Sequence, residues 1–163
     1  MLSLVALGPH NWRESLTMTV QPERQAWVSS VSPVALMLLA KSYIRPDGQV
    51  WFPFALEADG AMVGVLGVGI DDPGAPSVPQ TAWLHHVLID VDAQGRGYGR
   101  AAMRSVGRWI RQQHPTVTVV GLCVLPENVI ALALYRSLGF ESLGETSDGQ
   151  VILVTTVGEL AAA

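Results

Sequence analysis

The segment from residue 87 to residue 104 constrains the fold of this chain more than any other. It reads as an apolar strand, a short polar loop and a glycine-rich helix start. Gly95, Gly97 and Gly99 leave backbone N–H groups without side-chain cover where the helix begins. Because the unpaired N–H groups and the dipole of a helix both attract anions, the segment predicts a strand–loop–helix unit that binds a phosphate or pyrophosphate group.

Three kinds of phosphate-binding loop compete for this glycine tract. A P-loop needs a lysine beside its last glycine, and the single lysine of this chain, Lys41, lies far from the tract. Residues 97–102 do match the dinucleotide-binding pattern G-x-G-x-x-A. That pattern needs an acidic residue at the end of the next strand, and the strand expected at residues 117–124 has none. The sequence therefore excludes the P-loop and leaves dinucleotide binding as the weaker alternative.

The third kind of loop includes Gln94. The run Gln-Gly-Arg-Gly-Tyr-Gly at residues 94–99 resembles the Q/R-x-x-G-x-G/A signature of the GNAT superfamily of N-acetyltransferases, which bind acetyl-coenzyme A. A second segment, Pro-Glu-Asn at residues 126–128 followed by Leu-Tyr-Arg-Ser-Leu-Gly-Phe at residues 134–140, is similar to the family's second cofactor motif. Within the family, residues 83–99 are most similar to the spermidine and diamine acetyltransferase branch.

The length and composition fit one domain spanning residues 1–163. Hydrophobic residues make up 49% of the chain and charged residues 15%, which excludes a disordered chain. A net charge of −4 argues against a nucleic-acid partner. Neither a signal peptide nor a membrane-length apolar run is evident, so we expect a cytoplasmic protein with no membrane partner. The single cysteine, Cys123, is expected in the core; it excludes an internal disulfide and argues against a metal site.

Apolar periodicity and turn signals predict an α/β fold of order β-α-α-β-β-β-α-β-α-β-β. The expected strands are residues 2–7, 51–58, 61–70, 81–90, 117–124, 140–143 and 151–157, and the expected helices are residues 12–20, 33–43, 98–112 and 128–138. Asn11 followed by Glu14 predicts a capping box at the first helix, and Asp59-Gly60 predicts a hairpin turn. The GNAT resemblance implies the same fold, a mixed and mostly antiparallel sheet of about seven strands flanked by about four helices.

The resemblance also implies acetyl-coenzyme A as the co-substrate and assigns its contacts. The backbone of Val87 and Ile89 would hold the acetyl carbonyl and the pantetheine arm, and Asn128 would either contact the pantetheine or only cap its helix. The pyrophosphate contacts fall on the loop and the helix start, at Gln94, Gly95, Arg96, Gly97, Gly99 and Arg100. Further along the same helix, Arg104, Arg108 and Arg111 are expected to form a solvated face.

The mechanism that the resemblance implies is direct attack of an amine on the thioester, with no acyl-enzyme. Tyr135 would donate a proton to the departing thiolate. His85 is the candidate base, because strand alternation places it on the face of Val87 and Ile89, and because a histidine titrates near neutrality. The alternative for His85 is a packed, hydrogen-bonded strand residue. His86 is expected to face the other way and to be structural.

The acceptor is expected to be a primary amine, with a small polyamine or diamine favoured. Five acidic residues could supply negative potential, and three tryptophans could bind an amine by cation–π contact. These residues are Glu57, Asp59, Asp71, Asp72, Asp90, Trp27, Trp51 and Trp83. An amino acid, a peptide N-terminus or an aminoglycoside is the alternative acceptor, and a non-catalytic acyl-coenzyme A sensor is the alternative function. By analogy with the family, a homodimer using residues 151–157 is also expected.

Overall fold

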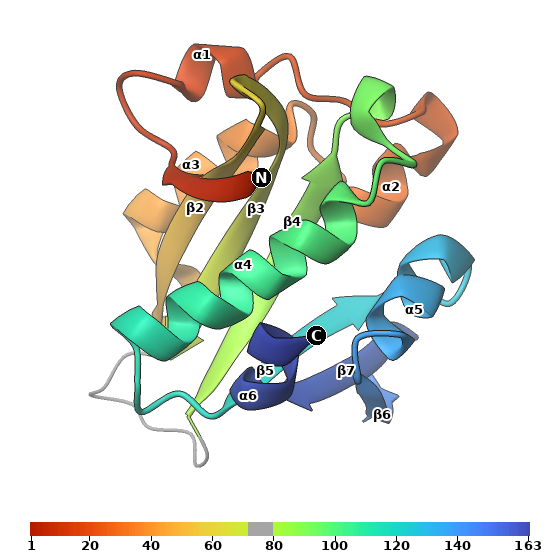
Figure 1. The fold of residues 1–163 in the computed structure, drawn as a ribbon. Helices are drawn as coiled ribbons and strands as arrows, with labels where there is room; N and C mark the ends of the chain where they lie inside the picture. Colours follow the sequence, from red (N-terminus) through yellow and green to blue (C-terminus); the bar gives the residue numbers. More distant parts are fainter. Residues whose placement is uncertain (72–79) are drawn as a thin grey trace.

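A single seven-stranded sheet organises the computed structural model, which describes residues 1–71 and 80–163 (Figure 1). The strand order is β1-β2-β3-β4-β5-β7-β6, and every neighbouring pair is antiparallel except β4 and β5. The strands are β1 (Leu2–Ala6), β2 (Gln49–Ala58), β3 (Ala61–Asp71), β4 (Thr81–Ile89), β5 (Val119–Val124), β6 (Glu141–Glu145) and β7 (Val151–Thr156). The prediction of a mixed, mostly antiparallel sheet is confirmed.

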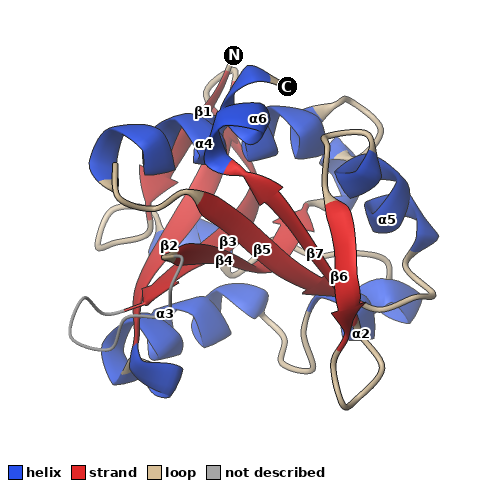
Figure 2. Ribbon diagram, turned by 90° about the horizontal axis from the view of Figure 1, so that it is seen from below, coloured by secondary structure: helices blue, strands red, loops and turns tan. Residues whose placement is uncertain are grey.

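Helices cover both faces of this sheet. Within the described residues they are α1 (Trp12–Ser15), α2 (Gln25–Val28), α3 (Val34–Ile44), α4 (Tyr98–Gln113), α5 (Val129–Arg136) and α6 (Val157–Ala162). Figure 2 shows α4 and α6 on one face and α3 on the other. None of these helices is long and apolar enough to cross a membrane.

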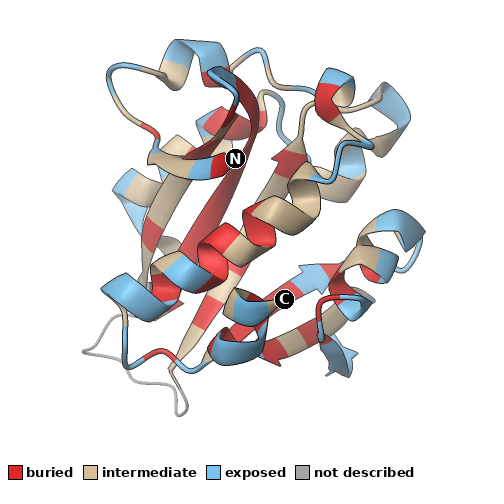
Figure 3. Ribbon diagram, viewed as in Figure 1, coloured by how far each residue is buried: buried red, intermediate tan, exposed pale blue. Residues whose placement is uncertain are grey.

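The core is divided by the sheet into two buried clusters. Under α4, Met103 and Ile110 pack with Leu66 from β3; Figure 3 shows that α4 carries both buried and exposed positions. On the other face, Leu38 of α3 packs with Leu88 of β4. Leu38, Leu66, Leu88, Met103 and Ile110 are all fully buried, so both faces of the sheet exclude water.

The expected element boundaries hold to within two residues except at the first helix, where the prediction of residues 12–20 is wrong. The helix ends at Ser15, and the capping box does not form. Instead, the Asn11 side chain accepts from the Gly8 N–H at 2.9 Å and so closes the turn that follows β1. Thr17 Oγ1 then donates to the Glu14 carbonyl at 2.8 Å, which competes with continuation of the helix.

Two short helices, α2 and α6, were not expected, so the described residues contain six helices rather than about four. Helix α2 has four residues, too few to show a helical period. Helix α6 carries a capping box in which the Thr156 side chain and Glu159 bond each other's backbone N–H groups. This Thr-x-x-Glu signal is visible in the sequence, but it follows an apolar strand without a break, so the sequence does not show where the strand ends and the helix begins.

Two hairpin turns are present, and the one at Asp59-Gly60 is the turn expected from the sequence. Asp59 and Gly60, with φ of 53° and 82°, join β2 to β3 through left-handed conformations, as a tight hairpin requires. The second hairpin joins β6 to β7 and places Gly149 at a φ of 83°. β7 pairs with β5 along its whole length and with β6 over residues 151–154, so most of its backbone is already paired within the sheet. Asp72, one of the acidic candidates for the acceptor site, lies outside the described residues.

Strand β4 contains a bulge that reverses its side-chain alternation. Gly67 of β3 lies opposite His85, whereas Val65, two residues earlier in β3, lies opposite Leu88, three residues later in β4. The extra residue is accommodated at His86, which has a φ of 51°. His85 therefore shares a face with Leu88, on the side of α3, and the prediction that it shares a face with Val87 and Ile89 is wrong.

Strands β4 and β5 pair over a short distance and then separate. Their parallel register runs only from Thr81 opposite Val119 to Leu84 opposite Leu122. Beyond this point the two strands point in different directions (Figure 1). Among the described residues, the backbone of β4 from His85 to Ile89 consequently pairs with no strand on the β5 side.

Candidate active site

Two cavities meet at the place where β4 and β5 separate. The first cavity, of about 510 Å³, lies along the end of β4, the 94–99 loop and the starts of α4 and α5. The second cavity, of about 640 Å³, lies between α2, α3, β4, β5 and the β6–β7 turn. The residues that line both, here called the junction, are Trp27, Val28, Val87, Asn128, Ala131 and Tyr135. A ligand in each cavity would therefore meet its counterpart beside Val87 and Tyr135.

The first cavity ends at a helix N-terminus suited to an anion. Gly97 is the N-cap of α4, with φ of 80° and no side chain capping the helix. Gly95 also has a left-handed φ of 77°, so the conformation of the loop favours glycine at both positions. A Cβ on Gly99 would lie 3.0 Å from Leu134 of α5, so this third glycine lets the two helices approach. The expected phosphate site thus has the geometry that the glycine tract predicts.

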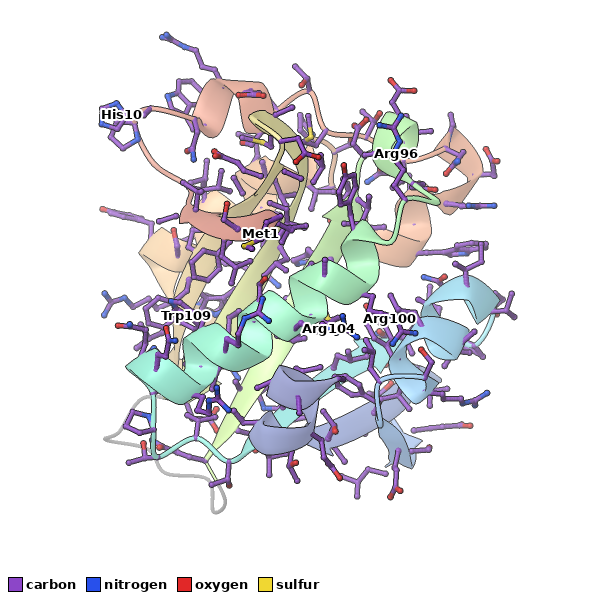
Figure 4. The ribbon with its side chains drawn as sticks, in the orientation of Figure 1. Met1, His10, Arg96, Arg100, Arg104 and Trp109 are labelled. Carbon is purple, nitrogen blue, oxygen red and sulfur yellow. The ribbon has the colours of Figure 1, made fainter. Side chains whose placement is uncertain are left out.

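Side chains around this N-terminus connect it to neighbouring elements. Arg100 lines the first cavity, and its Nη2 donates to Ser137 Oγ at 2.6 Å, across the space between α4 and α5 (Figure 4). Gln94 donates from Nε2 to the Ile89 carbonyl at 3.0 Å and so connects the loop to the end of β4. Arg96 is exposed and does not line the cavity, which leaves only its backbone for the expected contact.

At the junction, two expected residues come from α5 and its cap. Asn128 accepts from the Ala131 N–H at 3.2 Å, so it caps α5 and still lines both cavities. Tyr135 is 7% exposed and its ring lies 5.5 Å from that of Phe140. Burial raises the pKa of Tyr135 to about 12. The phenol therefore keeps its proton at physiological pH and can donate it.

Both histidines of β4 line the second cavity, which corrects the expectation that they point to opposite sides. The ring of His85 stacks on Trp51 with centroids 4.2 Å apart, and its Nε2 is buried with no hydrogen-bond partner among the described residues. Burial, and then the charges of Lys41 and His86, lower the pKa of His85 to about 3. His85 is therefore neutral at physiological pH but holds a proton weakly.

His86 is held by two hydrogen bonds that define its protonation. Its Nδ1 lies 2.9 Å from the Val28 carbonyl, which can only accept, and its Nε2 lies 3.2 Å from Lys41 Nζ, which donates. Burial lowers the pKa of His86, against the opposing effect of the Val28 hydrogen bond. His86 is thus a neutral residue that fixes the position of Lys41 and connects β4 to α2.

Three ionisable residues of the second cavity were not expected there from the sequence: Lys41, Cys123 and Asp148. Cys123 is exposed rather than in the core, which corrects that prediction. Partial burial and the nearby Asp148 carboxylate raise the pKa of the Cys123 thiol. The thiol stays protonated and is therefore a poor nucleophile, consistent with a reaction that forms no acyl-enzyme.

Most of the acidic residues expected to attract a polyamine lie elsewhere. Glu57, Asp59, Asp71 and Asp90 do not line the second cavity. Asp90 instead accepts from the Thr19 N–H at 2.9 Å and caps the turn that precedes the 94–99 loop. Of the three tryptophans that could bind an amine, Trp27 and Trp83 line the second cavity, whereas Trp51 is buried in the core and does not. Within residues 1–71 and 80–163, no group of three or more His, Cys, Asp or Glu side chains is placed to hold a metal ion.

A family model agrees with this geometry. The model described as Acetyltransferase (GNAT) family matches residues 12–140. The chain belongs to the GNAT acetyltransferase family. The resemblance carried by the two motifs is confirmed, and the dinucleotide-binding alternative for the glycine tract is set aside.

Individual GNAT relatives share fewer than a third of the aligned residues with this chain. The chain is 27% identical over 115 residues to a probable N-acetyltransferase family 8 member 5 from Mus musculus, covering 70% of this chain and 48% of that protein. It is 28% identical over 109 residues to N-acetyltransferase 8B from Homo sapiens, covering 66% of this chain and 45% of that protein. The chain thus spans about half the length of the curated relatives it matches.

Solved structures show the same fold. An aminoglycoside acetyltransferase, AAC(6')-Ib, in complex with coenzyme A has a TM-score of 0.74 at 19% identity, covering 100% of this chain and 99% of that one. A spermidine N-acetyltransferase from Vibrio cholerae, in complex with coenzyme A and spermine, has a TM-score of 0.72 at 18% identity, covering 98% and 97%. These likenesses confirm the fold class expected from the sequence.

Proposed function

We propose that this protein transfers the acetyl group of acetyl-coenzyme A to a primary amine of a small molecule. The observation that carries the proposal is the junction, where a cavity ending at an uncapped helix N-terminus meets a second cavity beside Val87 and Tyr135. Two ligands, one of them bearing phosphates, can meet there. The similar aminoglycoside and spermidine acetyltransferase structures each hold coenzyme A, which supports that ligand for the first cavity.

The first cavity would hold the cofactor in two parts. Its pyrophosphate fits the free N–H groups of α4 and the Arg100 guanidinium, because both supply positive potential. Its amide-bearing pantetheine arm would run beside the backbone of β4 at Val87 and Ile89. There it would take the position that β5 would occupy if the two strands stayed paired. Asn128 faces the same space while capping α5.

In the proposed reaction, the amine nitrogen attacks the thioester carbonyl carbon and forms the C–N bond. The negative charge that develops on the carbonyl oxygen would be stabilised by the Val87 N–H. The C–S bond then breaks, and the departing thiolate takes a proton from the Tyr135 phenol. The amine proton passes to water in the second cavity, and Tyr135 regains its proton from the solvent. A pKa of about 3 makes the His85 imidazole a weak base, so we assign it the role of orienting that water and not of accepting the proton.

The identity of the acceptor amine, the oligomeric state and the location of the protein stay proposals. A polyamine or diamine acceptor is supported by the similar spermidine acetyltransferase, and an aminoglycoside by the similar aminoglycoside acetyltransferase. The buried phenol of Tyr135 at the junction favours an enzyme over a non-catalytic acyl-coenzyme A sensor. A homodimer and a cytoplasmic location also stay predictions.

The test is acetyl-coenzyme A-dependent thiol release across polyamines, amino acids, peptides and aminoglycosides. Turnover with any primary amine, together with mass-spectrometric detection of the N-acetyl product, is the expected result. Binding of coenzyme A without turnover of any acceptor would contradict the enzyme and support the sensor. A parallel thermal-shift measurement with acetyl-coenzyme A and with a nicotinamide dinucleotide checks which cofactor the first cavity holds.

A further inference from the structure

The first cavity has a wall that lies outside both cofactor motifs. Residues 21–28 form a 3₁₀ turn, Pro22–Arg24, followed by α2. The Gln21 side chain donates from Nε2 to Gln94 Oε1 at 3.4 Å, and α2 lies close to the loop that precedes α4 (Figure 1). The 21–28 segment is therefore attached to the 94–99 loop, where the pyrophosphate is expected.

One side of the 21–28 segment faces the first cavity. In a 3₁₀ turn, side chains three positions apart lie over one another, and the Arg24 N–H donates to the Gln21 carbonyl at 2.8 Å. Arg24 thus lies on the same side of the turn as Gln21, which contacts the 94–99 loop. The guanidinium carbon of Arg24 lies 5.8 Å from the centroid of the Trp27 ring, three residues further on. Arg24 and Trp27 both line the first cavity.

The charge on the wall of this cavity is positive. Arg24 and Arg100 are the two charged side chains of the described lining, which contains no carboxylate. Among the described residues, no carboxylate forms an ion pair with Arg24. A guanidinium donates two parallel hydrogen bonds to a phosphate, and its stacking on Trp27 limits the freedom that binding would remove. The cavity can thus hold a pyrophosphate between arginines from two separate elements.

Resting on the proposed function, and on the coenzyme A that it places in the first cavity, we propose that Arg24 is a further cofactor-binding residue. Its guanidinium donates to the pyrophosphate, together with the N-terminus of α4 and Arg100. The pyrophosphate is the group assigned because Gln21, on the same side of the turn, contacts Gln94 at the start of the glycine tract. Since Trp27 also lines the second cavity, a cofactor bound to Arg24 would hold one wall of the acceptor cavity in place.

Two substitutions at Arg24 separate its charge from its packing on Trp27. Arg24→Met removes the charge and Arg24→Lys keeps it, at similar length. The matched control is Arg13→Met, because the exposed Arg13 lies 5.2 Å from the centroid of the Trp12 ring and lines neither cavity. Arg24→Met should raise the Kd for coenzyme A, measured by calorimetry, about tenfold or more. Arg24→Lys should retain part of the affinity, and Arg13→Met should bind as the wild type does.

A comparison of ligands identifies the group that Arg24 binds. Dephospho-coenzyme A keeps the pyrophosphate and lacks the ribose 3′-phosphate, whereas pantetheine lacks both. Arg24→Met should raise the Kd for dephospho-coenzyme A by the same factor as for coenzyme A. It should leave the Kd for pantetheine, measured by competition with coenzyme A, unchanged.

The outcomes separate this inference from the proposed function. Wild-type affinity in Arg24→Met would overturn it, and so would a loss for coenzyme A with none for dephospho-coenzyme A. Equal losses in Arg24→Met and Arg24→Lys, or an equal loss for pantetheine, would show that Arg24 acts only through packing and would also overturn it. All of these results leave acetyl transfer in place, because the assay needs no acceptor. Absence of coenzyme A binding by the wild type would overturn both. Arg24→Gln, which also lacks the charge, gives the same comparison if Arg24→Met does not fold.

Discussion

At the scale of single residues, the site depends on side chains whose burial fixes their protonation. Tyr135 is held as a phenol and His85 as a neutral imidazole, because in each case burial disfavours the charged form. Neither state can be deduced from the sequence, where both residues would titrate at their usual pKa values. The two residues therefore give the sharpest tests of the proposed reaction.

Tyr135→Phe removes the proton that the proposed reaction gives to the departing thiolate. We expect kcat to fall about 10²-fold or more, a typical contribution of general acid catalysis. The affinity for coenzyme A, measured by calorimetry, should stay close to that of the wild type, because the ring and its packing on Phe140 remain. A variant with unchanged kcat would remove Tyr135 from the mechanism.

The low pKa of His85 makes stability depend on pH. In the unfolded chain a histidine titrates near 6.5, whereas in the folded protein the pKa of His85 is about 3. The unfolded state therefore binds more protons between these values, and the free energy of unfolding should fall as pH decreases from 6.5 toward 3. Urea denaturation across this range should show a flatter pH dependence for His85→Asn than for the wild type. Substitution of the exposed His10 by Asn is the control.

The same pKa has a consequence for the rate profile. If His85 only orients water, kcat/KM should show no titration of His85 near pH 6.5, and His85→Asn should lower kcat without moving the pH profile. A dependence of kcat/KM on a group that titrates near pH 6.5, present in the wild type and lost in His85→Asn, would instead show that His85 accepts the amine proton itself.

At the scale of elements, long periodic segments could be predicted and short or tertiary features could not. β2, β3 and α4 show their apolar periods over ten residues or more, whereas α2 has four residues. The face of His85 was mispredicted because a bulge is decided by the register with β3, which leaves no local signal. Lys41 and Asp148 were missed because they reach the second cavity from elements far apart in the chain.

Contact between α4 and α6 gives a test at this scale. A Cβ on Gly107 of α4 would lie 2.7 Å from the Ala161 nitrogen of α6, a backbone atom that cannot move alone. Gly107→Ala should therefore destabilise the protein by about 1–3 kcal/mol, although alanine favours a helix. On α6, a Cβ at Gly158 meets nothing closer than 3.9 Å. Gly158→Ala should be neutral or stabilising, and equal effects in the two variants would contradict the packing.

The start of α4 is a second element with a matched pair of variants. Gly97→Glu places a negative charge at the expected pyrophosphate site and should abolish coenzyme A binding, measured by calorimetry. Gly97→Asn is the control, because asparagine tolerates the left-handed backbone and adds no charge. It should retain most of the affinity. Coenzyme A binding by Gly97→Glu at the wild-type affinity would reject the assignment of the glycine tract.

At the scale of the whole molecule, the expected ligand would connect elements from both sides of the gap between β4 and β5. The first cavity is lined by β4, the 94–99 loop, α4 and α5, which lie on both sides of the gap between β4 and β5. Acetyl-coenzyme A at about 100 times its Kd should stabilise the protein by about 2.7 kcal/mol and raise Tm by several degrees. A nicotinamide dinucleotide should leave Tm unchanged, and the reverse result would contradict the cofactor assignment.

The bulge at His86 also affects how this protein could change during evolution. The extra residue inverts the alternation of side chains along β4. An odd-numbered residue before the bulge therefore faces the opposite side of the sheet from an odd-numbered residue after it. Deleting one residue there would restore regular alternation, so that the residues on one side of the deletion would move to the opposite face of the sheet. A point substitution keeps the number of residues and would not have this effect. His85, before the bulge, lines the second cavity, whereas Ile89, after it, lines the first. One inserted residue thus lets the lining of one cavity vary while the strand segment beside the other stays unaltered.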